Sequence, residues 1–234
     1  MAGRVSRLRS ALSGGERVRG TFVKLRAPEV VDVVAATLDF LVVDLEHSQL
    51  SEADALALVR HAHALDFPAL VRLPLLERGL VNRLLEAGAA GIQLSTVTRA
   101  SEIAELRAAS EYAPQGTRSI SLAHPVAGYG STPLQTYLEG AIRPLVVAQV
   151  ETMSTEDPLE DIVAAAPDAI FVGVTDLTVD GGFDTERVRA RVAEILDAAG
   201  RGGVAAGGFG DDERFRYAVV SSDVALLQEA LARV

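Results

Sequence analysis

The sequence contains no cysteine and one lysine, Lys24. The absence of cysteine excludes disulfide bonds, thiolate nucleophiles and cysteine-ligated zinc. A mechanism that proceeds through a lysine Schiff base would have to use Lys24, because no other side chain in the chain can form one. A bound cation could polarise a carbonyl group without any amine.

The sequence also lacks an apolar run long enough to span a membrane. Residues 1–15 are basic but lack the apolar stretch of a signal peptide, which predicts a cytoplasmic protein. The net charge of −10 argues against a nucleic-acid partner, because phosphate binding needs a basic face. With 49% hydrophobic and 23% charged residues, the 234-residue chain has the composition of a soluble globular protein.

Short apolar runs alternate with segments of helical pattern along the whole chain. Runs this short, bounded by turn residues, are typical of strands buried on both faces of a parallel sheet. The predicted strands are residues 20–25, 40–45, 69–73, 91–94, 145–150, 169–174, 203–206 and 217–220. The predicted helices are residues 28–36, 51–65, 78–87, 98–112, 158–166, 184–199 and 223–233, preceded by a lead-in helix at 5–12.

This alternation predicts an α/β protein in which residues 1–234 form a single (β/α)8 TIM barrel domain with a short N-terminal lead-in helix. We count eight strand–helix units with no change of composition between them. A doubly wound open sheet is the alternative, but no Gly-x-Gly-x-x-Gly follows the first strand. The irregular segment 114–137 is too long for a plain loop and is expected to form a lid or a substrate wall.

Ionisable and polar side chains gather where the predicted strands end. In a barrel, residues at these ends point into one pocket, and buried charges are costly unless they have a partner. We therefore expect an active site there. The candidate residues are Lys24, Asp44, Glu46, His47, Arg72, Ser95, Glu151 and Asp176.

Glu151 and Asp176 follow two consecutive predicted strands. Their separation of 176 − 151 = 25 residues suits one strand–helix repeat, so the two carboxylates could lie side by side. Neighbouring carboxylates repel each other unless a proton or a cation lies between them. Oxygen ligands favour a hard cation such as Mg²⁺ or Mn²⁺. The alternative is that one or both carboxylates cap the following helix.

Three further side chains have both a catalytic and a structural interpretation. His47 could be a proton-transfer group that Asp44 orients, or a surface histidine. Arg72 could bind a carboxylate or a developing enolate oxygen, or it could pair with an acidic neighbour. The glycine-rich segment 202–212 could grip a phosphate, although it contains no basic residue.

Several motifs in these regions carry a family resemblance that covers nearly the whole chain. They are DLEH at 44–47, VRLP at 71–74, LLEAGAAGI at 84–92, YAPQGTRS at 112–119, QVET at 149–152, VGVTDLTVDGG at 172–182 and VVSSDVALL at 219–227. With these motifs the chain resembles the class II 2-keto-acid (HpcH/HpaI) aldolase family.

The resemblance implies a (β/α)8 barrel that binds a divalent cation, Mg²⁺ or Mn²⁺ with Co²⁺ as a further candidate, through Glu151 and Asp176. It implies that pyruvate chelates this cation and that the enzyme assembles as a homo-oligomer, commonly a hexamer. It also assigns roles to other residues. Arg72 would stabilise the enolate oxygen, His47 with Asp44 behind it would move protons through water, Gln149 would line the pocket, and the backbone at Gly173 and Val174 would hold the carboxylate.

The chain departs from the family pattern where the aldehyde is selected. Ser95, Thr96 and Val97 stand in place of Pro-Met-Val, and Glu86 replaces an aspartate that in the family reaches a neighbouring subunit's pocket. Val174 stands where the family usually has proline, Ser119 where it usually has glycine, and the C-terminal helix is short. We therefore expect the family chemistry with an altered acceptor.

The resulting hypothesis is cleavage or formation of a 4-hydroxy-2-keto acid, giving pyruvate or a related 2-keto acid plus an aldehyde through a metal-stabilised enolate. One alternative is a biosynthetic condensing enzyme that offers the same enolate to another electrophile. The other is a non-catalytic barrel that binds a keto acid.

Overall fold

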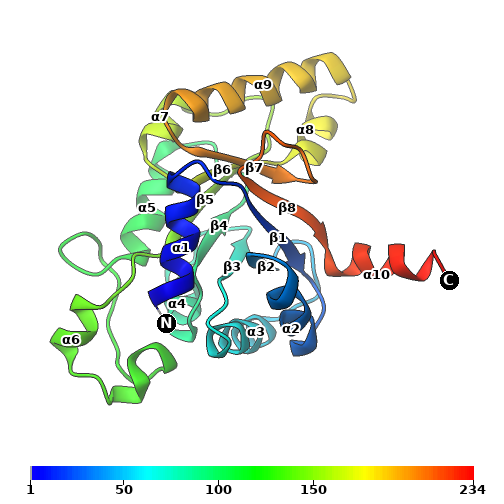
Figure 1. The fold of residues 1–234 in the computed structure, drawn as a ribbon. Coiled ribbons are helices and arrows are strands. Elements are labelled where there is room, and N and C mark those ends of the chain that lie inside the picture. Colours follow the sequence, from blue (N-terminus) through cyan, green and yellow to red (C-terminus); the bar gives the residue numbers. More distant parts are fainter. Residues whose placement is uncertain (1) are drawn as a thin grey trace.

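Eight parallel strands pair in chain order and close into a barrel in the computed structural model, which describes residues 2–234 (Figure 1). The strands are β1 (Val18–Val23), β2 (Phe40–Asp44), β3 (Ala69–Leu73), β4 (Gly91–Leu94), β5 (Leu145–Val150), β6 (Ala169–Val172), β7 (Ala205–Phe209) and β8 (Tyr217–Ser222). The ring closes where β8 pairs with β1. The predicted (β/α)8 barrel is confirmed.

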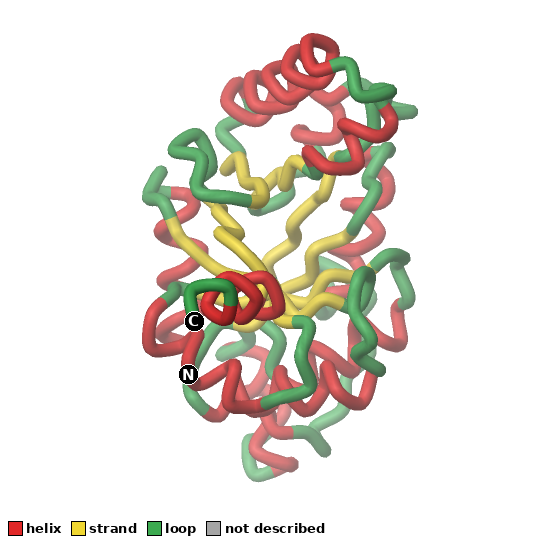
Figure 2. Tube along the Cα trace, turned by 90° about the vertical axis from the view of Figure 1, so that its right-hand side faces the viewer, coloured by secondary structure: helices red, strands yellow, loops and turns green. Residues whose placement is uncertain are grey.

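Helices surround these strands (Figure 2). They are α1 (Ala2–Ser13), α2 (Pro28–Thr37), α3 (Glu52–Ala64), α4 (Arg78–Ala87), α5 (Ala100–Ser110), α6 (Leu134–Glu139), α7 (Leu159–Ala164), α8 (Val174–Asp180), α9 (Thr185–Arg201) and α10 (Asp223–Leu231). The local sequence determines where several helices begin or end. Ser51 and Asp54 form a capping box at the start of α3, and Gly88 ends α4 at a φ of 110°.

The alternation of side chains along each strand divides the core into two layers. Outward-facing residues such as Val43 and Val71 pack beneath the helices. Inward-facing residues such as Phe22, Val42 and Leu70 fill the barrel interior. Since successive strand residues point to opposite sides, the next inward position after each interior residue lies at the barrel mouth.

The lead-in helix α1 closes the other end of the barrel. Leu8 and Leu12 of α1 are buried and belong to the same apolar cluster as Val18 and Phe40 of the interior. The predicted helix at 5–12 is therefore confirmed and extended in both directions. Its role is to cover the amino-terminal opening, which leaves the mouth at the opposite end for chemistry.

Two predictions about the later units are wrong. Strand β6 ends at Val172 rather than at residue 174, because the chain turns at Gly173 and starts α8, a helix that was not predicted. No helix lies between β7 and β8, where residues 210–216 connect the strands directly, so the chain has fewer than eight strand–helix units. The glycine-rich segment also supplies β7 itself (Ala205–Phe209).

The irregular segment 114–137 contains the 3-10 helix η1 (Pro125–Gly130) and the start of α6. At the other end of the chain, α10 extends away from the barrel (Figure 1). Among residues 2–234, no helix combines the length and apolar character needed to cross a bilayer.

Candidate active site

The barrel mouth collects the side chains that follow the interior layer on the first five strands. Lys24 stands two residues after Phe22, Asp44 two after Val42, and Arg72 two after Leu70. Ser95 and Glu151 occupy the corresponding positions after Gln93 and Gln149. Successive side chains of a strand point to opposite sides, so each of these residues points inward like the residue two positions before it. They therefore lie together at the end of the barrel.

Arg72 and Asp44 form a buried, bidentate ion pair. Arg72 Nε donates to Asp44 Oδ1 at 2.9 Å and Nη2 donates to Oδ2 at 2.7 Å. The guanidinium also stacks on the Phe22 ring, with Cζ 4.3 Å from the ring centroid. The pair fixes both the position and the plane of the guanidinium, because the planar fork matches the carboxylate.

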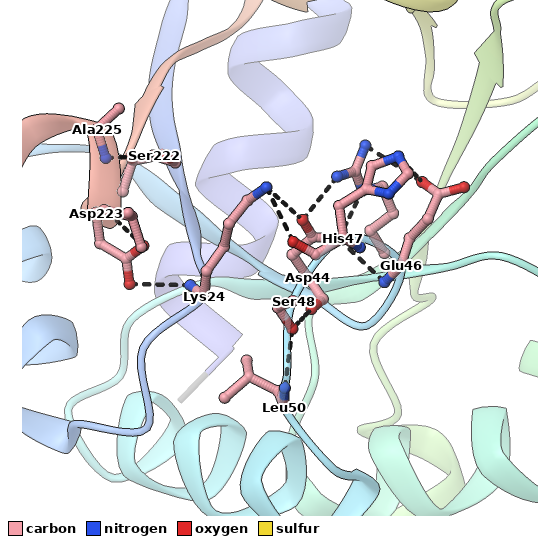
Figure 3. A network of polar contacts seen from close by, with 12 residues as sticks. Lys24, Asp44, Glu46, His47, Ser48, Leu50, Ser222, Asp223 and Ala225 are labelled. Carbon is pink, nitrogen blue, oxygen red and sulfur yellow. Dashed lines mark hydrogen bonds and ion pairs between the residues drawn. The ribbon is translucent and has the colours of Figure 1, made fainter.

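Two further charged side chains contact this pair (Figure 3). Lys24 Nζ lies 3.1 Å from Asp44 Oδ2 and donates to the His47 carbonyl oxygen at 3.2 Å. Glu46 Oε2 lies 3.3 Å from Arg72 Nη1 and accepts the Ser95 hydroxyl at 2.6 Å. Two cations and two carboxylates therefore alternate across the β1–β4 side of the mouth.

Asp44 keeps its negative charge in this environment. Burial by itself raises the pKa of the carboxyl, but the hydrogen bond and charge of Arg72, the His47 backbone N–H and the charge of Lys24 outweigh it and lower the pKa to about 2. Asp44 is therefore ionised at neutral pH and cannot supply a proton.

The lowered pKa predicts a pH dependence of stability. A depressed folded-state pKa contributes stability above the ordinary value of 3.8, and this contribution is lost as the pH falls from about 4 towards 2. The shift corresponds to about 2 kcal/mol. Urea unfolding of wild type and Asp44→Asn should show the stability difference between them narrowing by about 1 kcal/mol from pH 6 to pH 3. A constant difference over this range would contradict the assignment.

Asp44 does not orient the His47 imidazole in the way the sequence suggested. Its Oδ1 accepts the backbone N–H groups of Glu46 and His47, at 3.1 and 3.2 Å, besides the bond from Arg72. The His47 side chain is 58% exposed, and its Nε2 lies 3.8 Å from Glu46 Oε2. His47 thus lies at the rim between the ionic cluster and water, and Asp44 shapes the turn that carries it.

Glu151, at the end of β5, is held by three hydrogen bonds. Thr96 donates both its backbone N–H, at 2.8 Å, and its hydroxyl, at 2.6 Å, to Oε1. The Gln149 amide donates to Oε2. Thr96 has a φ of 51°, in the left-handed region that β-branched residues rarely adopt, and it bonds Glu151 through both groups in this conformation.

A chain of buried amides runs below Glu151, and the sequence analysis missed its lower part. The Gln93 amide donates to Gln149 Oε1 at 2.7 Å, and the Tyr217 hydroxyl donates to Gln93 Oε1 at 3.2 Å. Burial raises the pKa of Tyr217, so its hydroxyl stays protonated. A glutamine at an inward position of an otherwise apolar strand is the sequence signal for Gln93.

Asp176 lies in the first turn of α8 and not at a strand end, and its side chain is exposed. The turn before it fits closely around Glu151: a Cβ at Gly173 would lie 2.6 Å from Glu151 Oε2. The Gly173 N–H donates to Val150 O at 3.1 Å, so this N–H already has a partner within the chain. Val174 is the first residue of α8.

The donor set fits a hard cation. A carboxylate offers about four lone-pair positions, and Glu151 uses three of them, which leaves about one for a metal. Within residues 2–234, no three His, Cys, Asp or Glu side chains form a group that could hold a metal ion. A cation at Glu151 and Asp176 would therefore complete its coordination with water and substrate oxygens, the arrangement usual for Mg²⁺.

Glu86 lies outside this site. It is on α4, near the end of the helix that leads back to the amino-terminal face, and its carboxylate accepts the Asn82 amide at 3.2 Å. It does not join the Arg72 and Glu151 groups of its own chain.

Comparison with known proteins identifies the family of the chain. Residues 19–215 match the family model described as HpcH/HpaI aldolase/citrate lyase. A hydroxypyruvate/pyruvate aldolase of Roseovarius nubinhibens is 32% identical, over 82% of this chain and 75% of that protein. One of Paraburkholderia phytofirmans is 30% identical, over 93% and 91%.

Among solved structures, an HpcH/HpaI aldolase/citrate lyase family protein of Burkholderia cenocepacia superposes with a TM-score of 0.87 at 27% identity, covering 97% of this chain and 96% of that one. The family model covers most of the chain, from the second residue of β1 to beyond the end of β7, and includes Lys24, Arg72, Glu151 and Asp176. The chain therefore belongs to the HpcH/HpaI aldolase/citrate lyase family, a family of aldolases and lyases.

Proposed function

We propose that the protein is a divalent-metal-dependent aldolase that cleaves or forms a 4-hydroxy-2-keto acid, with pyruvate or a related 2-keto acid and an aldehyde as the other partners. The observation that carries the proposal is the arrangement of the mouth. A guanidinium fixed by the buried Asp44 shares one end of the barrel with the buried Glu151, in a family of aldolases and lyases.

Glu151 and Asp176 would hold the cation, with Mg²⁺ or Mn²⁺ preferred and Co²⁺ as a further candidate. When bound, the cation supplies a Lewis acid for the 2-oxo group. Thr96 and Gln149 keep the Glu151 carboxylate in one orientation, since together they bond both of its oxygens. The exposed side chain of Asp176 leaves its carboxylate accessible at the rim.

Arg72 would stabilise the negative charge that develops on the enolate oxygen. In the cleavage direction the C3–C4 bond breaks, its electron pair passes into the enolate, and the C4 hydroxyl loses its proton as the aldehyde carbonyl forms. Two of the five N–H groups of Arg72 donate to Asp44, and Nη1 forms an ion pair with Glu46 at 3.3 Å. The N–H groups that are not bonded to Asp44 remain for the substrate. A fixed donor of this kind needs no reorganisation during the reaction.

His47 would carry the proton between the mouth and bulk water, because its imidazole is exposed and next to Glu46. Ser95 would line the acceptor side of the pocket and Gln149 its floor, and the backbone of Val174 would hold the substrate carboxylate. Glu86 would act on a neighbouring subunit in a homo-oligomer, such as a hexamer, since it lies on the outer helix α4. We propose a cytoplasmic location for the enzyme.

The test follows hydrogen–deuterium exchange at the pyruvate methyl group by NMR, with Mg²⁺ or Mn²⁺ and then with EDTA. It detects enolate formation without a choice of aldehyde. Exchange that requires the cation and stops on chelation is expected. If a sample shown to contain bound metal gives no exchange, the enolate mechanism is wrong. Product analysis with mixed acceptors then distinguishes an aldolase from a condensing enzyme.

A further inference from the structure

A cavity of about 550 Å³ lies beside the starts of β4 and β5, at the end of the barrel opposite the mouth. Ala89 and Ala90, which precede β4, and Pro144, which precedes β5, form part of its wall. Most of the remaining lining comes from the segment 111–144, whose helix α6 lies outside the barrel (Figure 1). None of the mouth residues named above lines this cavity. Its volume is in the range of small-molecule sites.

Three buried polar atoms of the lining residues have no hydrogen-bond partner within residues 2–234. They are the Ser110 hydroxyl, His63 Nε2 and Arg118 Nη2. Ser110 is 1% exposed and is the last residue of α5, where a serine usually bonds a carbonyl group of the preceding turn. Burial lowers the pKa of His63, so its imidazole is uncharged at neutral pH. Because unpartnered buried groups cost free energy, a polar occupant of the cavity would stabilise the protein.

The charge of Arg118 is not neutralised by a carboxylate. Its Nε donates to Asn82 Oδ1 at 2.9 Å, and its guanidinium stacks on the Tyr112 ring with Cζ 4.6 Å from the ring centroid. In the described part of the chain Arg118 forms no ion pair, whereas Arg143, the other arginine of the lining, pairs with Glu111 at 2.8 Å. Since Arg143 and Glu111 cancel, Arg118 leaves the lining with one net positive charge.

The phenols of Tyr112 and Tyr137 provide a further donor. Their hydroxyl oxygens lie 2.9 Å apart, so one O–H group donates to the other phenol and the second is left for another acceptor. Burial raises the pKa of Tyr112, and its hydroxyl therefore stays protonated. Apolar side chains complete the wall, among them Leu85, Val126, Leu138 and Ile142. The cavity thus combines donors for an anionic group with apolar surface.

We propose that this cavity is a second ligand site, separate from the mouth, and that it binds a small organic monocarboxylate with an apolar body. The carboxylate would accept from Arg118 Nη2, from the free tyrosine hydroxyl and from the Ser110 hydroxyl. One net positive charge suits a monoanion, because a phosphate dianion would bring a second negative charge that has no partner. A neutral apolar ligand would leave the guanidinium unpaired.

Titration with 4-fluorobenzoate, followed by ¹⁹F NMR, tests the site. Wild type should bind this probe saturably with a dissociation constant of about 1 mM or below. Arg118→Met should weaken binding by about tenfold or more, because it removes the unpaired charge. Fluorobenzene, which lacks the carboxylate, should also bind about tenfold or more weakly. Neither inorganic phosphate nor pyruvate with Mg²⁺ should displace the probe.

Arg78→Met is the matched control. Arg78 Nη2 donates to the carbonyl oxygen of Thr117, next to Arg118 in the chain, but Arg78 does not line the cavity. Its affinity for the probe should stay within about twofold of wild type. Equal affinities in Arg118→Met and wild type, or displacement by pyruvate with Mg²⁺, would overturn the proposal, because the probe would then lie elsewhere. An absence of saturable binding to wild type would overturn it too, since the cavity would then hold only water.

Ser110→Ala covers the case in which Arg118→Met folds poorly. The Ser110 hydroxyl has no partner in the described residues, so its removal should leave the melting temperature without ligand unchanged or raise it. The affinity for 4-fluorobenzoate should nevertheless fall by about threefold or more. Wild-type affinity in this variant would overturn the proposal. Both measurements follow binding and not turnover, so they test the second site whether or not the aldolase function is correct.

Discussion

Arg72→Lys is expected to lower kcat by about 100-fold or more, both for pyruvate methyl exchange and for cleavage of a 4-hydroxy-2-keto acid. Removing one preorganised donor to a developing oxyanion typically has an effect of this size. A lysine keeps the positive charge but cannot form both bonds to Asp44, stack on Phe22 and still direct a donor at the substrate.

Exchange and turnover measured side by side check this prediction. Arg107→Lys is the matched control, because Arg107 is also a largely buried arginine paired with carboxylates, Asp168 and Glu111, but it lies at the end of α5 away from the mouth. Its turnover should stay within about twofold of wild type. Wild-type turnover in Arg72→Lys would refute the role of the guanidinium fork.

Glu151→Gln is expected to abolish metal-dependent exchange and to weaken Mn²⁺ binding by more than about 100-fold, since even residues behind a metal ligand change affinity by 10–100-fold. The substitution removes one of two proposed carboxylate ligands. It also places an amide opposite the Gln149 amide, which donates to Glu151 and already uses its own oxygen to accept from Gln93. Titration of the free-Mn²⁺ EPR signal gives the dissociation constant without any activity measurement.

Thr96 provides a graded comparison for Glu151. Thr96→Ala loses the hydroxyl bond to Oε1 and keeps the backbone bond, so Mn²⁺ affinity should fall about tenfold, and Thr96→Ser should recover it. Glu156→Gln is the control for the carboxylate lost in Glu151→Gln, because Glu156 is exposed and contacts Thr98 and Arg99 outside the mouth. Equal Mn²⁺ affinities in wild type and Glu151→Gln would exclude Glu151 as a ligand.

The sequence predicted the strands best where both faces are buried. The bounds of β3, β4 and β5 agree with the predicted runs at 69–73, 91–94 and 145–150. Continuous apolar runs end where the strand leaves the core, so the pattern and the structure share one cause. The ends of the apolar runs also located Asp44, Arg72 and Glu151. Each is the first ionisable inward-facing residue after the apolar part of its strand.

The sequence predicted the positions of turns and helix starts less well. Val174 continues the apolar pattern of β6 but starts α8, because Gly173 lets the chain turn closely against Glu151. Apolarity alone cannot distinguish the last residue of a strand from the first of a helix that packs nearby. The count of eight strand–helix units was also too high, because neither the predicted helices nor the structure include one between β7 and β8.

The sequence by itself determined that the chain forms a barrel and at which end of the barrel the candidate site lies. It also determined most of the residues at that end, because the alternation of side chains along a strand is a local property of the chain. Only the tertiary structure decided how those residues pair: that Asp44 holds Arg72 and not the His47 imidazole, that Thr96 and Gln149 clamp Glu151, and that Lys24 shares Asp44. These pairs join strands far apart in the chain, and which of several charges meet depends on barrel closure and side-chain length, which no local pattern records.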